Sequence, residues 1–354
     1  MTTPSGQIKF SNIISEFGPS FADPTNGLPN RSKLGSYRVS QSVAGRNWPL
    51  DDGVPTSGPI KFSDLRNKTL NVVVDYSGET EYGVDSTNKY NNGVVIGYKS
   101  RPSIDSADSK KVQNVIRKTI GAATGVALKT GSGWGSNTIL KYYIANGGKV
   151  FGSGGKGGEG AGTNGTTVGT CGLEAGFPGG HAFGVSYNCS ITVESGGILA
   201  GGGGGGGGGG FTYSGGSGDG RFMGGGGGGG AGLPAGGGGP RGNKCVDGGR
   251  NNNYGVAGSA GSLYSGGAGG SGSNWGDGGV ARKGGNGGDL GLDGKHGNPL
   301  SGGGRTPDSG FSSAGAPGGT AGAAVIRNSS ELTAVITKQG GTVSGSETKV
   351  GSFL

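Results

Sequence analysis

The chain has 354 residues, of which 93 are glycine and only 30% are apolar. Ordinary globular proteins contain about 7% glycine and about 45–50% apolar residues. Because glycine loses more backbone freedom on folding than any other residue and brings no side chain to bury, apolar burial alone does not explain how this chain folds. Glycine does not occupy every third position, which excludes collagen, and no stretch of about 20 residues is continuously apolar, which excludes a membrane span.

The formal net charge is +8, and most of the excess lies in the first part of the chain. Residues 1–146 carry 17 basic and 11 acidic side chains, whereas residues 147–322 carry 10 and 9. A glycine-rich RNA-binding segment needs arginine beside glycine pairs, and no Arg-Gly-Gly triplet occurs, so we expect no nucleic-acid partner. The three cysteines form no CxxC pair and specify neither a zinc site nor a disulfide framework.

Residues 1–70 contain a duplicated box. The segment SGQIKFSNI at 5–13 returns as SGPIKFSDL at 57–65, with the same residue at both Ser positions and at Gly, Ile, Lys and Phe. The alternation of Ile and Phe with Lys predicts a short half-buried strand, and the following Ser-Asn or Ser-Asp predicts the N-cap of a helical turn. Prolines and glycines between the copies predict an irregular strap rather than a compact domain.

Residues 71–146 have the most ordinary composition. The runs at 71–76, 93–98 and 138–144 are β-rich and bounded by turn residues, and 112–123 has the spacing of one short helix. These patterns predict a small β or α+β module of about 75 residues, near the lower limit for a self-sufficient core.

Three copies of one pattern surround the glycine-rich region 147–322. The segments 144–152, 191–201 and 335–345 each read as a strand, a Gly-Gly turn, a short returning strand and then glycine. This pattern predicts β-hairpins that clamp the glycine tracts from both sides, the last of them in a C-terminal clamp at 323–354.

The longest glycine tracts are 201–210, 224–230 and 236–239. One interpretation is a flexible linker. The other is a packed bundle of polyproline II helices, in which backbones without side chains approach closely and bond to one another; the longest tract would then span about 31 Å. We favour the bundle because clamp elements lie on both sides. The predicted fold is therefore mainly β with irregular structure, a glycine-rich polyproline II bundle or sandwich preceded by the small module.

The residues between glycine tracts become turns at the ends of the rods, where side chains can vary without disturbing the packing. They are rich in Tyr, Trp, Phe and Asn, which antibody binding loops also use as rigid anchors and adaptable polar groups. An equally weighted interpretation is that the aromatic residues only cap the bundle. The candidate recognition residues are Phe211, Tyr213, Arg221, Phe222, Asn252, Tyr254, Tyr264, Trp275 and His296.

Few patterns in the chain suggest catalysis or metal binding. Residues 284–289 match the start of a calcium-binding nonapeptide, but Gly291 stands where an apolar residue is needed and no tandem copy follows. The chain has two histidines and no nucleophile motif or phosphate loop. A glycosidase built on two carboxylates needs no local motif and remains the enzyme alternative. We expect no catalytic residues, no metal and no cofactor.

The duplicated box resembles a short element that recurs in structural proteins of marine tailed phages. The strand, Gly-Gly, strand and polyglycine pattern at 144–210 is similar to phage tail-fibre and tail-tip adhesins, in particular the small adhesins at the distal tip of long tail fibres in T-even-like phages. The resemblance covers 1–70 and 140–345. Glycine-rich motifs in that family form a layered polyproline II sandwich, so the resemblance implies the same arrangement here.

The resemblance implies a non-enzymatic virion protein on the tail or particle surface. The opening MTTPSGQIKF has no signal-peptide pattern, so we expect synthesis in the host cytoplasm. The N-terminal part would attach to other tail or virion proteins, through Ile8, Phe10, Ile60 and Phe62, with a place in a trimeric fibre assembly. The loops would bind a host surface protein or glycan without membrane insertion. The alternative is a purely structural baseplate, neck or capsid-decorating protein with the glycine sandwich as a stiff spacer.

Overall fold

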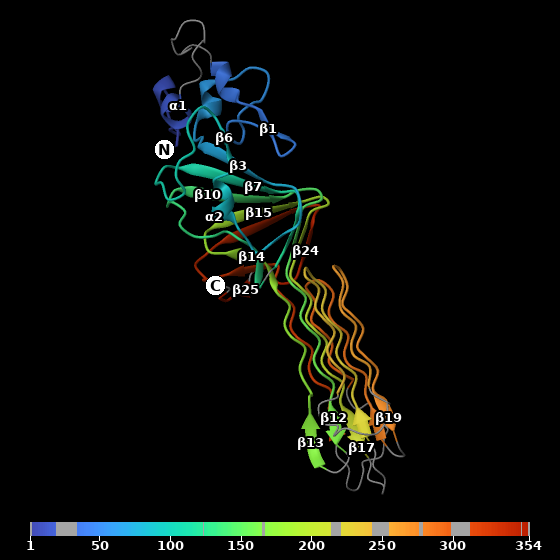
Figure 1. Ribbon diagram of the computed structural model, residues 1–354. Coiled ribbons are helices and arrows are strands. Elements are labelled where there is room, and N and C mark those ends of the chain that lie inside the picture. The colour runs from blue at the N-terminus through green and yellow to red at the C-terminus, as the bar shows by residue number, and fades with distance from the viewer. Residues whose placement is uncertain are drawn as a thin grey trace.

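The computed structural model describes residues 2–18, 34–122, 124–164, 167–213, 221–242, 255–275, 279–298, 312–347 and 349–352. Three parts follow one another along an elongated molecule: an N-terminal unit, a β-solenoid of three sheets, and a glycine-rich bundle that extends away from the solenoid (Figure 1). The mainly β class predicted from the sequence is confirmed. None of the helices in the described ranges has the length and apolarity that a membrane crossing requires.

The N-terminal unit combines short helices and one hairpin around its own core. Its elements are helix α1 (Phe10–Phe17), the 3₁₀ helices η1 (Leu34–Arg38) and η2 (Phe62–Leu65), and strands β1 (Gln41–Val43) and β2 (Arg46–Trp48). The core side chains are Ile8, Ile13, Phe17, Tyr37, Leu50, Val54, Leu65 and Leu70. The described residues of the unit therefore pack as a small compact body, whereas the sequence predicted an irregular strap between the two boxes.

The two copies of the box adopt the same local structure, which differs from the prediction. Each helix begins at the Phe, one residue after the Lys, so no strand forms and the Ser-Asn or Ser-Asp pair lies inside the helix. The Asn12 side chain accepts the Lys9 backbone N–H at 2.9 Å, and the Asp64 side chain accepts that of Lys61 at 2.8 Å. A side chain at the third helical position that bonds back to the N-cap backbone is half of a capping box, and this bond fixes where each helix starts.

The solenoid consists of three sheets to which each coil of the chain contributes one strand. In spatial order, the first sheet contains β23 (Ala334–Gln339), β15 (Cys189–Glu194), β10 (Thr138–Ile144), β7 (Lys110–Ile116), β3 (Leu70–Tyr76) and β6 (Val94–Ile96). The second contains β24 (Thr342–Ser344), β16 (Ile198–Ala200), β11 (Lys149–Phe151), β8 (Thr119–Gly121) and β4 (Glu81–Tyr82). The third contains β25 (Lys349–Val350), β22 (Val325–Arg327), β14 (His181–Val185), β9 (Val126–Lys129) and β5 (Val84–Asp85), and helix α2 (Ser86–Tyr90) follows β5. All these pairings are parallel except that of β3 with β6.

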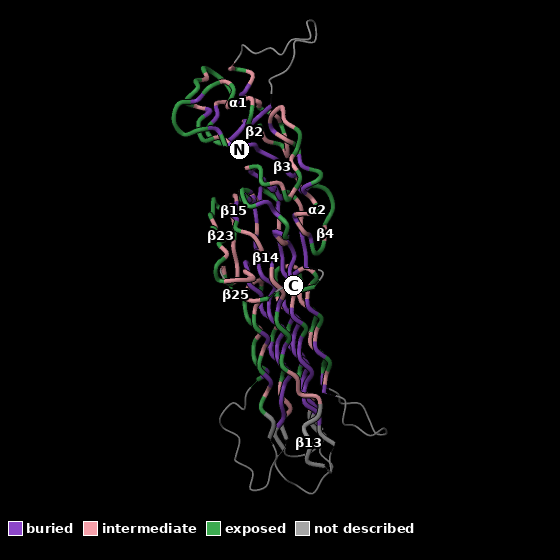
Figure 2. The backbone as a smooth tube through the Cα atoms, turned by 90° about the vertical axis from the view of Figure 1, so that its left-hand side faces the viewer, coloured by how far each residue is buried: buried purple, intermediate pink, exposed green. Residues whose placement is uncertain are grey.

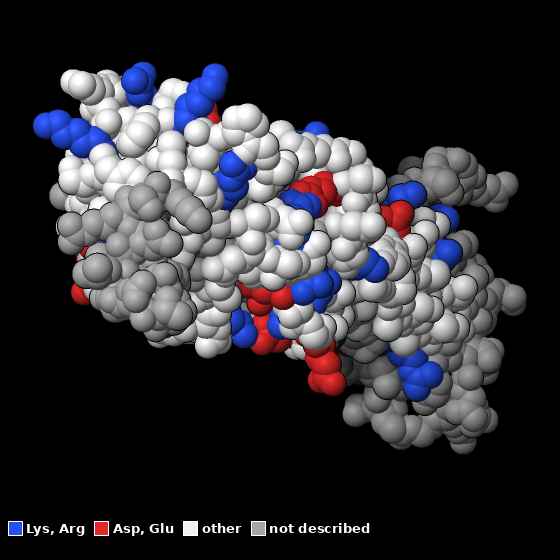
Figure 3. Space-filling view, turned by 90° about the horizontal axis from the view of Figure 1, so that it is seen from above, with Lys and Arg blue, Asp and Glu red and all other residues white. Residues whose placement is uncertain are grey.

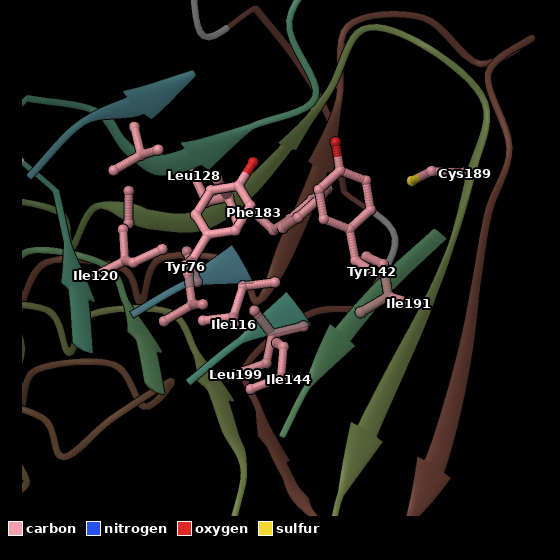
Figure 4. Close-up of a cluster of buried hydrophobic side chains, with 14 of the residues drawn as sticks. Tyr76, Ile116, Ile120, Leu128, Tyr142, Ile144, Phe183, Cys189, Ile191 and Leu199 are labelled. Carbon is pink, nitrogen blue, oxygen red and sulfur yellow. The ribbon is translucent and has the colours of Figure 1, made fainter. Parts of the chain in front are cut away.

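The solenoid interior is the largest apolar core in the described part of the chain. Equivalent inward positions of successive coils stack in columns, such as Tyr76, Ile116, Ile144 and Val193. The rings of Tyr142 and Phe183 meet edge to face at 4.8 Å between the first and third sheets, and both side chains are fully buried (Figure 4). Residues 71–146 supply strands to the same sheets as residues 323–352, so they fold as parts of one body.

The three strand, Gly-Gly, strand copies are corners of the solenoid and not hairpins. Within a copy the two strands belong to different sheets, and each pairs with the equivalent strand of the next copy, as Ile144 pairs with Val193. The first glycine of each corner, Gly147, Gly196 and Gly340, has φ near +80°, which only glycine adopts readily.

The helix expected at 112–123 is absent, because this segment forms β7 and β8. The corner between the two strands interrupts the period-two alternation of apolar residues, so their spacing resembles that of a helix.

The glycine-rich region is inserted into two coils of the solenoid. The chain leaves after β11 and returns at β14, then leaves again after β16 and returns at β22. Between these points extended segments run back and forth side by side, and burial follows the bundle along its length (Figures 1 and 2). The segments, called rods below, are residues 152–161, 172–180, 201–210, 224–230, 236–242, 255–262, 265–272, 282–289, 292–298 and 314–323.

Backbone hydrogen bonds join the rods, and they repeat every three residues. The N–H groups of Gly155, Gly158 and Ala161 donate to the carbonyls of Gly203, Gly206 and Gly209 at 2.8–2.9 Å. Three residues is the period of a polyproline II helix. All of residues 201–210 are buried, and a Cβ placed on almost any of these glycines would overlap a backbone carbonyl of a neighbouring rod. The tracts are therefore a packed core made of backbone, and the linker interpretation is wrong for the described residues.

Candidate functional site

The end of the bundle farthest from the solenoid, called the distal tip below, is built from short antiparallel strands (Figure 1). One sheet has the order β13 (Thr167–Cys171), β12 (Gly162–Asn164), β18 (Arg221–Met223), β19 (Ser273–Trp275), and the other the order β20 (Gly279–Ala281), β17 (Phe211–Tyr213), β21 (Ser312–Ser313). Each strand begins or ends where a glycine rod stops. A Cβ at most glycine positions of a rod would overlap a neighbouring backbone, and the runs without glycine at the tip form β-strands instead.

The tip brings together five of the predicted recognition residues. Arg221 on β18 lies opposite Trp275 on β19, and Phe222 lies opposite Asn274. Tyr213 on β17 lies opposite Gly279. Phe211 also lies at the tip, so the structure brings these separate inserts together at one end of the bundle.

Phe211 is not available for a ligand. Its side chain is 4% exposed and packs with Ala161 and Leu173 at the end of the bundle. The first side chain after ten glycines fills the space that the last rod layer leaves, so the interpretation of aromatic residues as caps holds for this position. Phe211 therefore packs under the strands of the tip, and we no longer count it among the residues that could contact a ligand.

Two other predicted residues do not lie at the tip. Tyr264 is in a turn at the solenoid end of the bundle, where its ring packs on Phe151 at 5.8 Å and its hydroxyl bonds to the Lys149 Nζ at 2.8 Å. His296 is exposed on a rod whose backbone runs beside residues 283–286. The predicted Asn252 and Tyr254 lie outside the described residues.

Polar side chains at the surface of the bundle accept hydrogen bonds from the backbone of neighbouring rods. Asn286 and Asp289 accept the N–H groups of Gly269 and Gly266 at 3.0 and 2.9 Å, so the residues that match a calcium motif act as hydrogen-bond acceptors for the adjacent rod. Asp293 accepts the N–H of Ala321 in the same way. Within the described ranges no cluster of His, Cys, Asp and Glu is arranged to hold a metal ion.

A histidine lies where the bundle joins the solenoid. His181 begins β14, and its Nδ1 accepts the backbone N–H of Ala323, two residues before β22, at 2.8 Å. Burial lowers the pKa of the imidazole below 6.5, and the nearby Lys349 ammonium lowers it further. The neutral ring thus joins the two places at which the chain returns from the bundle.

The predicted attachment residues lie at the opposite end of the molecule, in the N-terminal unit. Ile8 is part of the core of this unit, while Phe10 and Ile60 are half-buried against it. Phe62 is 42% exposed, and its ring meets that of Phe10 edge to face at 6.2 Å. The two copies of the box therefore lie side by side, and only the second presents its Phe to solvent.

Comparisons with known proteins identify a family for most of the chain. The model of the phage tail fibre adhesin Gp38 family matches residues 82–348 and leaves the N-terminal unit outside the matched range. A search of curated proteins found no match. The crystal structure of the gp37-gp38 adhesin tip complex of the bacteriophage S16 long tail fiber aligns over 82% of this chain and 88% of that chain, with 19% sequence identity and a TM-score of 0.36.

Proposed function

Since this chain belongs to the phage tail fibre adhesin Gp38 family, we propose that its distal tip binds a receptor on the host surface while its N-terminal part attaches to another tail protein. The receptor is a surface protein or a glycan, and the contacts come from the side chains and loops around β17, β18 and β19. The role is binding without catalysis, at the tail of the virion.

The observation that carries this proposal is the continuous backbone ladder between the two ends. The bonds that pair β11 with β16 continue into the bundle, from Gly152 N–H to the Ala200 carbonyl at 2.9 Å and then every three residues toward the tip. Because each rod is bonded to its neighbours, the tip is held at a fixed distance from the solenoid. Strands and loops at the end of such a stalk can vary in sequence without disturbing the core that supports them.

Adsorption assays test the proposal. Purified full-length protein should bind host cells and block adsorption of the phage, and exchange of residues 211–223 or 273–281 for those of a related adhesin should change the host range. A matched control exchanges the turn at 262–265, which contains the exposed aromatic Tyr264 but lies at the solenoid end.

Two outcomes would favour the alternative of a structural spacer. The first is purified protein that does not bind host cells, and the second is a set of tip exchanges that leave the host range unchanged while the control behaves identically. A protein that binds cells and also releases sugars from them would contradict the non-enzymatic role.

A further inference from the structure

The acidic side chains in the described part of the N-terminal unit are engaged within the molecule. Glu16 is 1% exposed and accepts the N–H of Leu70 at 2.8 Å. Asp51 is 3% exposed and forms an ion pair with Lys111 on the outer face of the first sheet. Asp52 and Asp64 are engaged as well. Asp52 forms ion pairs with Lys111 and Lys141 at 3.0 and 2.6 Å, and Asp64 caps η2. The negative charge of the unit therefore faces the solenoid or a helix end.

Three basic side chains of the same unit face solvent instead. Lys9, Lys61 and Arg66 are exposed, and within the described ranges none of them has an ion-pair partner. Figure 3 looks onto this end of the molecule, where Lys and Arg side chains project into solvent. Within the described ranges the unit thus exposes three cations without an ion-pair partner, whereas the half-exposed Asp52 carboxylate is paired with Lys111 and Lys141.

An aromatic ring lies beside these charges. Phe10 is held against Tyr37 at 5.7 Å, and Phe62 stacks on Phe10 but keeps 42% of its surface exposed. Lys9 and Lys61 directly precede the two rings, at the same N-cap position in each copy of the box. The contact between the rings therefore brings both lysines to one part of the surface. We call Lys9, Lys61 and Phe62 the basic–aromatic patch.

We propose that the basic–aromatic patch docks an acidic segment of the tail protein to which this adhesin attaches, with an apolar side chain of that segment covering Phe62. This inference rests on the proposed function and specifies the chemistry of the partner. Unpaired cations attract a segment of opposite charge and set its orientation, and a half-exposed aromatic ring supplies apolar area at the centre. The patch lies outside residues 82–348, so the recognition is carried by the part of the chain beyond the family match.

The test uses full-length protein and phage particles assembled without the adhesin. Labelled protein is mixed with the particles, and the bound fraction is measured by sedimentation. We expect the double variant Lys9→Glu and Lys61→Glu, and separately Phe62→Ala, to bind at least about tenfold more weakly than the unmodified protein, because charge reversal places like charges against an acidic partner. Raising the salt concentration should weaken the unmodified protein more than the double variant Lys9→Gln and Lys61→Gln.

Matched controls come from the bundle. Lys283 is exposed there, and Phe177 is 46% exposed, close to the value for Phe62. Lys283→Glu and Phe177→Ala should bind the particles as the unmodified protein does. Thermal melting of every variant verifies that the N-terminal unit remains folded, and Lys9→Gln with Lys61→Gln keeps the test valid if the glutamates disturb folding.

The outcomes separate this inference from the proposed function. If the unmodified protein binds the particles and the patch variants bind equally well, the docking surface is wrong while tail attachment stands. If the unmodified protein does not bind the particles at all, tail attachment itself fails. If the patch variants lose binding to DNA or to anionic vesicles but keep binding to the particles, the patch serves a different anion and the inference is wrong.

Discussion

Close approach between backbones predicts that one glycine in the bundle is far less replaceable than another. A Cβ on Gly205 would overlap the backbone carbonyl of Lys156, whose carbon would lie 2.5 Å away and whose oxygen would lie closer still. Ordinary contact begins at 3.4 Å, so the two rods must separate by at least about 0.9 Å. The N–H groups of Gly155 and Gly158 on the same rod pair donate across at 2.8 Å. That separation stretches both bonds beyond the useful range for hydrogen bonding.

The free-energy cost of Gly205→Ala follows from those two bonds. Each buried N–H left without a partner costs about 1–3 kcal/mol, so we expect a loss of about 2–6 kcal/mol in the free energy of unfolding. Gly237→Ala is the matched control, because a Cβ there has no atom within 4 Å. This change should be neutral or stabilise the protein by up to about 1 kcal/mol, since alanine reduces the freedom of the unfolded chain.

Urea unfolding of the full-length variants, followed by far-UV circular dichroism, measures both changes. The reasoning requires a clearly lower midpoint for Gly205→Ala and an unchanged or higher one for Gly237→Ala. Equal midpoints for the two variants would refute the view that backbone contact between rods stabilises the bundle.

Three further predictions concern the solenoid. The folded-state pKa of His181 is lowered from 6.5, so its contribution to stability is present above that pH and is lost as the pH falls below it. The melting temperature should therefore fall between pH 7 and pH 5, and His181→Asn should make the melting temperature less dependent on pH. Asp51→Asn leaves Lys111 buried with a weaker partner and should cost about 3 kcal/mol in urea unfolding, whereas Asp51→Asn combined with Lys111→Met should recover most of it. Gly147→Ala should lower the free energy of unfolding by about 1–2 kcal/mol because of its positive φ alone. Gly196→Ala should lower it more, because the added Cβ also meets a neighbouring side chain, and equal losses measured by calorimetry would contradict this.

The bundle was predictable from sequence because its cause is local. Long glycine tracts leave backbone groups as the only available bonding partners, and that holds wherever the tracts lie. Strand pairing in the solenoid was not predictable in the same way. Gly147 needs a positive φ in a hairpin turn and in a solenoid corner alike, and the choice is made by the distant contact between Ile144 and Val193.

The candidate site was partly predictable for a related reason. A turn between two rods has the same composition at either end of the bundle, so composition alone placed Tyr264 with the recognition residues. Successive rods run in opposite directions, so the turns between them alternate between the tip and the solenoid end, and this alternation places Tyr264 at the solenoid end beside Phe151. The apolar alternation of the two boxes favours Ile8 and Phe10 as attachment residues, yet Ile8 is buried whereas the lysines of both boxes are exposed.

The shared ladder between strands and rods has a consequence for how such a molecule can change in length. Since the bonds recur every three residues, a rod can gain or lose residues without losing its partners only in triplets, and all rods must change together. One triplet added to every rod would lengthen the stalk by about 9 Å. The distance from the solenoid to the tip can therefore change only in steps of one three-residue repeat, while the spacing of the four rods that join the solenoid directly follows that of its parallel strands.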